Sequence, residues 1–148
     1  MSRALQGDLD SALSAAVCEM QVAVDELGQV LESERSALGE SDSEALNRAG
    51  ARKQALMLKL EQLDIERLQL SRQSPEEASR LEPEWNHVVQ CLRTTQQLNQ
   101  RNGQEVGQRL RQVRQALSIL TGHAGEVGVY GRAGELNVKM RSRALAEA

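Results

Sequence analysis

The sequence predicts an all-α fold: an antiparallel, coiled-coil-like bundle of about three long helices at residues 1–121, followed by a flexible C-terminal tail at residues 122–148. Three observations predict this. Aliphatic residues recur at steps of three and four, the spacing that keeps one stripe facing a partner helix. With no Phe, one Trp, one Tyr and two prolines, the chain must build its core from aliphatic side chains and favours helix. After Thr121, glycine recurs at every third position, which excludes a regular helix there.

The first helix is expected at residues 8–38, with Asp8 as its N-cap. Its apolar stripe consists of Leu9, Leu13, Val17, Met20, Val24, Leu27, Leu31 and Leu38. Gly39 predicts the end of this helix, and the polar run at residues 40–43 predicts the N-cap of the next one.

The second helix is expected at residues 42–71. Its main stripe consists of Leu46, Ala49, Leu56, Leu60, Leu63 and Leu70. Further apolar residues widen the stripe and predict neighbours on more than one side: Met57, Leu58, Ile65 and Leu68. Gly50 inside this helix is explained by close packing or by mild fraying. Ser74 predicts a cap, and Pro75 fits the first position of a following helix.

The third helical segment is the longest, and Pro83 marks either a kink or a fresh start near Glu82. At about 1.5 Å per residue, a helix at residues 82–120 spans about 58 Å and the first helix about 46 Å. The third helix is therefore expected to overhang its partners. Its stripe consists of Leu81, Trp85, Val88, Leu92, Thr95, Asn99, Asn102, Val106, Leu110, Val113, Leu117 and Leu120.

Polar and small residues occupy the middle of that stripe: Thr95, Asn99 and Asn102, then Gly103 and Gly107. Two interpretations stand. Buried asparagines fix helix register and spaced glycines permit close helix approach. Alternatively, this stretch is a soft joint between a packed first half and a second half with its own task.

Beyond this stretch, five aliphatic residues form one face, flanked by arginines at positions 109, 111 and 114. The five are Val106, Leu110, Val113, Leu117 and Leu120. If the first two helices do not reach this far, the face has no cover within the chain and must find a partner. We therefore predict that it binds one.

Apolar residues also occur in the glycine-spaced tail, where Val127, Val129 and Tyr130 precede a turn-like segment that contains Gly131 and Gly134. A short recognition element that becomes ordered on binding fits this pattern. A frayed tail whose few apolar residues rest on the bundle fits it as well.

Charge is segregated along the chain. Residues 1–44 carry ten acids against Arg3 and Arg35, a net charge of −8, whereas residues 45–121 carry twelve bases against eight acids, a net charge of +4. This predicts an acidic helix packed antiparallel to basic ones. The acidic total of −3, without aromatic or glycine-rich binding motifs among the arginines, argues against nucleic acid as a partner.

No catalytic, metal or cofactor site is expected. Glu84 and His87 form a single pair, whereas a metal-binding bundle repeats such a motif. Both histidines, His87 and His123, are interpreted as surface residues, and Trp85 as a core residue. Cys18 and Cys91 are interpreted as reduced, buried small hydrophobes. Without an apolar signal core or a stretch of about 20 apolar residues, the protein is expected in the cytoplasm, without stable membrane insertion.

Three segments of the chain resemble the flagellar export chaperones of the FlgN family. The first is the end of the opening helix at residues 31–38, LESERSAL, which is generic to helical bundles. The second, residues 98–103, LNQRNG, is followed by Leu110, Leu117 and residues 120–122, LTG. The third, residues 129–134, VYGRAG, is similar to the family's Tyr-Gly-x-x-Gly segment. From about Asn137 the resemblance ends.

The resemblance implies a small helical cytosolic protein that binds hook-associated junction proteins of the FlgK and FlgL type before their export. It implies that the C-terminal helical segment of this client is kept soluble and delivered to the export gate (FlhA type). It also implies that Tyr130 helps dock the chaperone at the gate, with Gly131 and Gly134 permitting the turn. The family's members need no ATP or metal of their own.

Two other classes of function remain as alternatives. A structural or regulatory coiled-coil homodimer would cover the distal stripes by self-association, and sedimentation would reveal it. A helical metal or cofactor bundle would be revealed by metal analysis.

Overall fold

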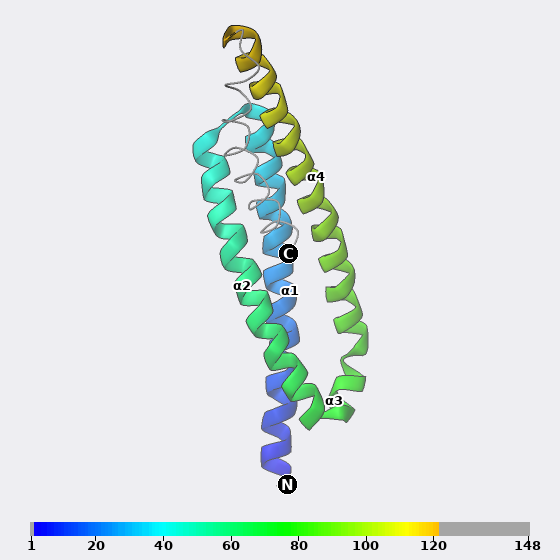
Figure 1. Cartoon of the computed structure of the whole chain (residues 1–148). Coiled ribbons are helices and arrows are strands. Elements are labelled where there is room, and N and C mark those ends of the chain that lie inside the picture. The colour runs from blue at the N-terminus through cyan, green and yellow to red at the C-terminus, as the bar shows by residue number, and fades with distance from the viewer. Residues whose placement is uncertain (1, 122–148) are drawn as a thin grey trace.

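The structure is a computed structural model that describes residues 2–121, and in these residues four helices follow one another. They are α1 (Arg3–Glu40), α2 (Ser43–Gln73), the short α3 (Pro75–Arg80) and α4 (Glu82–Thr121). α2 runs antiparallel to α1, and α4 runs antiparallel to α2, so α1 and α4 point the same way (Figure 1). The predicted all-α bundle of three long helices is confirmed. Pro83 marks a fresh start, because α4 begins at Glu82 and the proline lies in its first turn.

Helix ends follow local capping chemistry, with two departures from the prediction. α1 begins before residue 8 because Ser2, not Asp8, is its N-cap: the Ser2 Oγ accepts a hydrogen bond from the Leu5 amide at 3.2 Å. α1 also runs past Gly39, and its left-handed C-cap residue is Ser41, with φ of 56°.

The caps predicted at the next two helices are confirmed in part. Asp42 is the N-cap of α2, and its side chain accepts a hydrogen bond from the Ala45 amide at 3.1 Å. Pro75 takes the first position of α3, as predicted. Ser74 makes no side-chain cap there; its hydroxyl instead accepts a hydrogen bond from Gln6 Nε2 at 3.0 Å.

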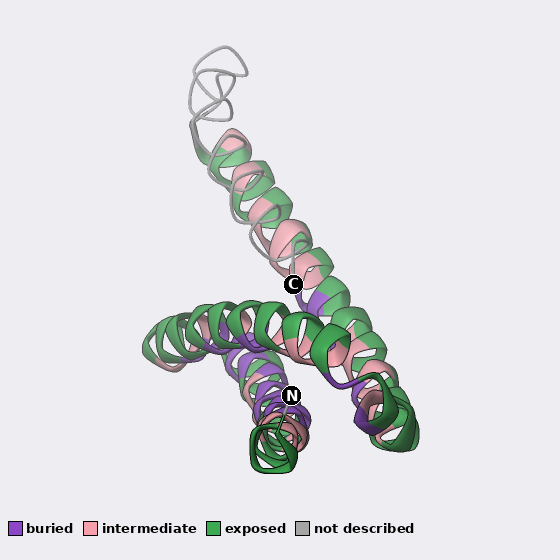
Figure 2. Cartoon of the chain, turned by 90° about the horizontal axis from the view of Figure 1, so that it is seen from below, coloured by how far each residue is buried: buried purple, intermediate pink, exposed green. Residues whose placement is uncertain are grey.

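α1 is the central helix, and both α2 and α4 pack against it. The core contains most of the predicted α1 stripe and part of the α2 and α4 stripes, and its buried members are Leu13, Val17, Met20, Ala23, Val24, Leu27, Leu31, Leu56, Leu60, Leu63 and Val88. In Figure 2, the buried residues lie where the helices face one another, and the exposed residues lie on the outer sides of the helices. Burying each Leu, Val or Met side chain contributes about 1.5–3 kcal/mol.

The widened stripe of α2 does not have the second neighbour that the sequence predicted. Leu58, Ile65 and Leu68 are 57%, 59% and 43% exposed, because within residues 2–121 the backbone of α2 closely approaches only α1 and α3. For these three residues the prediction is wrong, although Lys53 and Arg67 of α2 do contact side chains of α4. Close packing does not explain Gly50 either, since a Cβ there would meet nothing within 4 Å.

None of the helices in the described part of the chain is long and apolar enough to cross a membrane.

Candidate partner-binding site

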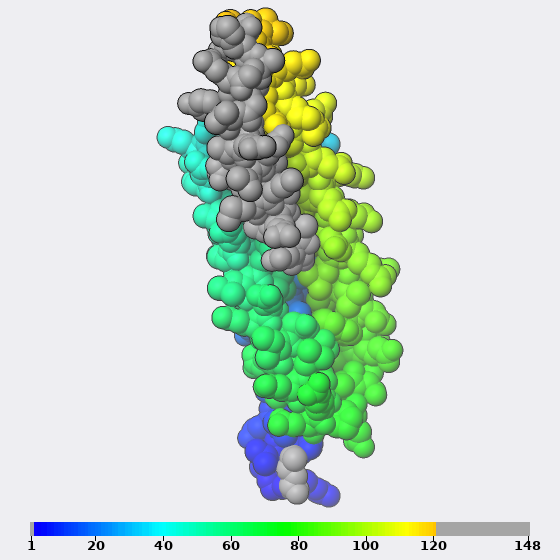
Figure 3. Space-filling view, viewed as in Figure 1, coloured from blue at the N-terminus to red at the C-terminus, as the bar shows by residue number. Residues whose placement is uncertain are grey.

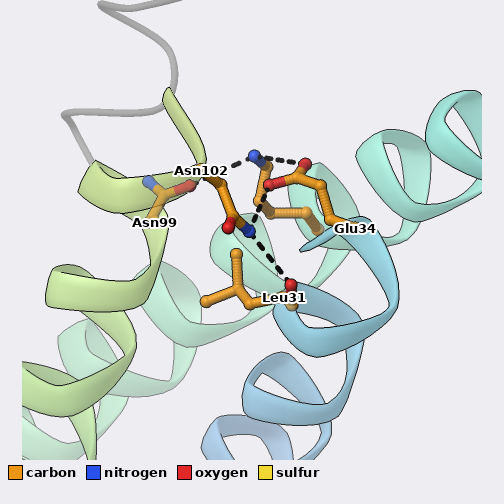
Figure 4. Close-up of polar contacts among 5 residues, drawn as sticks. Leu31, Glu34, Asn99 and Asn102 are labelled. Atoms are coloured by element: carbon orange, nitrogen blue, oxygen red, sulfur yellow. Dashed lines mark hydrogen bonds and ion pairs between the residues drawn. The ribbon is translucent and has the colours of Figure 1, made fainter. Parts of the chain in front are cut away.

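A cluster of polar side chains buried between the three long helices fixes how α4 lies on α1 (Figure 4). We call it the Glu34–Lys53 cluster; it joins Glu34 of α1, Lys53 of α2, and Asn99 and Asn102 of α4. Lys53 Nζ pairs with Glu34 Oε2 at 2.8 Å and donates to Asn99 Oδ1 at 3.1 Å. Asn102 Nδ2 donates to Glu34 Oε1 at 2.9 Å and to the Leu31 carbonyl at 3.0 Å. Each of these four side chains is therefore held by a partner on another helix.

Forming this cluster costs free energy because its charges leave water, and removing one of its members would cost more. None of its four residues is more than 5% exposed, so both charges are removed from water. Removing one member of a buried ion pair leaves the other charge uncompensated, at about 3–5 kcal/mol. A shift of α4 along α1 would separate the same partners. The interpretation of Asn99 and Asn102 as register-fixing residues is therefore supported, and α4 continues as one helix through Gly103 and Gly107.

Sequence analysis missed Glu34 and Lys53, although a signal was present. Glu34 lies three residues after Leu31 and four before Leu38, so it occupies a position of the α1 stripe. Lys53 occupies the corresponding kind of position in α2, between Ala49 and Leu56. Opposite charges at stripe positions of two neighbouring helices predict a buried pair.

The first two helices stop covering α4 at Arg109. Arg109 Nη1 donates to the hydroxyl of Ser41, the residue at the corner between α1 and α2, at 3.0 Å. Residues 110–121 continue beyond this corner for about 18 Å at ~1.5 Å per residue. Figure 1 shows the end of α4 projecting past the corner. The predicted overhang is confirmed.

The predicted face is most exposed on the projecting part of α4. We call the face formed by Val106, Leu110, Val113, Leu117 and Leu120 the distal face. Its first two residues are half-buried. The next three are 55%, 48% and 82% exposed. Ile119, which sequence analysis did not include, is 79% exposed on another side of the helix. The two helices of the hairpin therefore leave most of the distal face accessible.

The other predicted partner-binding residues belong to the tail. Val127, Val129, Tyr130, Gly131 and Gly134 lie outside the described residues.

The charge pattern predicted from the sequence appears as ion pairs between α1 and α2. Glu26 pairs with Arg52 at the surface, and Glu34 pairs with Lys53 in the interior. α1 is antiparallel to α2 as predicted, but parallel to α4.

Within α3, Arg80 donates a hydrogen bond to Glu77. This hydrogen bond, together with the charge of the Glu77 carboxylate, raises the pKa of Arg80.

The two cysteines are free, but the prediction that both are buried is wrong. Cys18 is exposed and Cys91 is half-buried. The Cys91 sulfur lies 3.8 Å from Nε2 of His87, one turn away on the same helix, and His87 is exposed as predicted. In residues 2–121, no group of three or more His, Cys, Asp or Glu side chains is arranged to hold a metal ion.

The family model described as FlgN protein matches residues 1–137, which include all four helices and the tail segment with Tyr130. No curated protein and no solved structure matches the chain.

Proposed function

The chain belongs to the FlgN family of flagellar export chaperones, and on this premise we propose that it binds hook-associated junction proteins of the FlgK and FlgL type and delivers them to the export gate. The observation that carries this proposal is the distal face: a continuous aliphatic stripe on a helix that outruns its own bundle. A chaperone that meets its client before export acts in the cytosol.

The distal face suits an amphipathic helix as its ligand. Helix-in-groove recognition buries matching apolar stripes, at about 25 cal/mol per Å² of apolar surface removed from water. The accessible part of the face offers Val113 and Leu120, which are more than half exposed. A client whose C-terminal segment is an amphipathic helix supplies the matching stripe. Ordering both segments has an entropic cost that keeps the affinity moderate, so the client can be released.

The tail has the second role in this proposal. By family resemblance, Tyr130 docks the loaded chaperone on a gate protein of the FlhA type, while Gly131 and Gly134 permit the turn that presents it. Val127 and Val129 extend the apolar contact. Separating the two roles predicts that Tyr130→Ala weakens gate binding and leaves client binding intact.

The distal face is tested by the double change Val113→Glu with Leu120→Glu. Both side chains are exposed in the free protein, so folding is retained, whereas a client helix would have to bury two carboxylates. We expect client affinity to fall about 100-fold, since each lost aliphatic contact contributes about 1.5 kcal/mol or more. Isothermal titration calorimetry with a hook-associated protein measures this loss.

The matched control is Leu5→Glu with Val22→Glu, which introduces the same two charges at positions of α1 that are 50% and 61% exposed. This control variant should leave the affinity unchanged. Wild-type affinity in the double variant would remove the distal face from the mechanism.

A coiled-coil homodimer remains the alternative function, because the same exposed stripe could pair with its copy. Sedimentation velocity distinguishes the two: a tight dimer that Val113→Glu with Leu120→Glu dissociates, without any affinity for hook-associated proteins, would favour the dimer.

A further inference from the structure

α2 and α4 both pack on α1, and hollows remain in the space between them. In the described helices their backbones make no close approach. Two hollows, of about 520 Å³ and about 350 Å³, lie along this space, and both are lined by Arg67 of α2 and Trp85 of α4. The Arg67 guanidinium lies 3.6 Å from the centre of the Trp85 ring. We call the two hollows together the α2–α4 trough; Figure 3 views the side where α2 and α4 flank α1.

The trough has an apolar lining and an apolar rim. Its floor is supplied by α1 through Leu13, Val17, Met20 and Leu27. On the rim, Leu58 of α2 is 57% exposed. The same flank of α2 continues with the exposed Ile65 and Leu68, which sequence analysis expected to have a second neighbour. An apolar surface of this kind is typical of a site that another segment covers.

The charges around the trough are mostly negative. Glu61 and Asp64 of α2 and Glu82 of α4 line it, against the single cation Arg67. Asp64 already pairs with Arg67 at 2.9 Å. In the described part of the chain, Glu61 and Glu82 have no ion pair. The matching ligand is therefore a segment that combines apolar side chains with positive charge.

We infer that residues 136–145 of this chain bind in the α2–α4 trough. The segment, LNVKMRSRAL, contains Lys139, Arg141 and Arg143 and no acidic residue. Its apolar residues are Leu136, Val138, Met140 and Leu145. The family match ends at residue 137, so most of the segment lies outside the part of the chain that the family model describes.

The connection is long enough to reach. The distance along α4 from Thr121 back to the level of Leu92 is about 44 Å, at ~1.5 Å per residue. The chain from Thr121 to Leu136 spans up to about 50 Å when extended. Leu136 can thus lie beside Leu92, with the basic residues continuing toward Trp85. The connection must be nearly straight, so its length is critical.

Trp85 is the only tryptophan of the chain and lines both hollows, so its fluorescence reports on the trough without any label. The test compares the full chain with the variant Lys139→Glu, Arg141→Glu, Arg143→Glu. Reversing the three charges opposite the acidic residues of the trough should shift the bound-to-unbound ratio about tenfold toward unbound. We expect red-shifted Trp85 emission and stronger quenching by acrylamide.

A charge-matched control variant changes three exposed arginines of the helices, Arg3→Glu, Arg48→Glu and Arg101→Glu, and should leave Trp85 quenching as in the wild type. Adding Glu61→Lys and Glu82→Lys to the tail variant should restore the protection. Unchanged quenching in the tail variant, or failure of this charge swap to restore protection, would overturn the inference.

Two further measurements decide whether the segment binds within its own chain. Deleting residues 123–126 shortens the connection by about 14 Å, so Trp85 should become as accessible as in the tail variant. Protection that survives this deletion, or that increases with protein concentration, would assign the trough to another copy's tail and refute binding in cis.

Discussion

The first and second halves of α4 have the same stripe spacing and opposite surroundings. Val88, in the first half, is fully buried against α1, whereas Val113 is 55% and Leu120 is 82% exposed. Nothing in the local sequence separates the two valines, since each lies on the same stripe of one continuous helix. What differs is the neighbour: α1 and α2 turn at Ser41, which Arg109 contacts, and α4 continues. A stripe therefore predicts a helix and a face, and only the arrangement of helices decides whether the face is free to bind.

The polar cluster marks the last firmly packed level before this change. The Glu34–Lys53 cluster holds Asn99 and Asn102 of α4 against α1, less than two turns before the distal face begins. By holding α4 at one register on α1, the cluster fixes which residues of α4 lie beyond the corner at Ser41. Changes to the cluster, to the two halves of the stripe and to the corner contact thus test the comparison, in order of decreasing effect.

The largest effect is expected from Lys53→Met. It leaves the Glu34 carboxylate buried without its cation, and we expect the free energy of unfolding to fall by about 3–5 kcal/mol. Urea denaturation followed by circular dichroism measures it. Combining Lys53→Met with Glu34→Gln removes both charges and keeps an acceptor for Asn102, so this double variant should be more stable than the single one. If the double variant is the less stable of the two, the pair does not behave as a buried ion pair.

The next largest effect is a difference in unfolding free energy between the two halves of α4 when the same substitution is made in each. Val88→Ala removes two buried methyl groups and leaves a cavity, at about 2 kcal/mol of unfolding free energy. Val113→Ala should change the same quantity by no more than about 0.5 kcal/mol, as at other exposed sites. Thermal unfolding of both variants is the measurement. Equal losses would mean that the distal half is packed as firmly as the first.

The smallest effect concerns the corner contact. Arg109→Ala removes a hydrogen bond to Ser41 and a surface ion pair with Glu105 at 3.6 Å. The expected loss of stability is about 0.5 kcal/mol, because both interactions are solvent-exposed. Hydrogen exchange should also become faster in residues 110–120 and stay unchanged in residues 86–102. Faster exchange throughout α4 would show that the corner stabilises the whole helix.

Prediction from the sequence succeeded where a feature depends on residues within a few positions of one another. The helices, the stripe of α1, the cap at Asp42 and the start of α4 near Glu82 all follow from spacing and capping within a turn or two. The ends of α1 were predicted wrongly, but they too are set by nearby residues. Ser2 is the N-cap, six residues before the expected Asp8, and α1 continues past Gly39 to its C-cap at Ser41. The length difference between the first and third helices also predicted the overhang, because helix length follows from residue number.

The tertiary structure alone decided which apolar and charged residues are covered. Leu58 and Leu60 are equally apolar and two residues apart, yet one is 57% and the other 8% exposed, because α2 has α1 on one side and the open trough on the other. Likewise, the sequence contained the stripe positions of Glu34 and Lys53, but only the pairing of α1 with α2 placed those charges together. Burial depends on where neighbouring helices pack and where they end, and this is set by contacts between residues far apart in the chain.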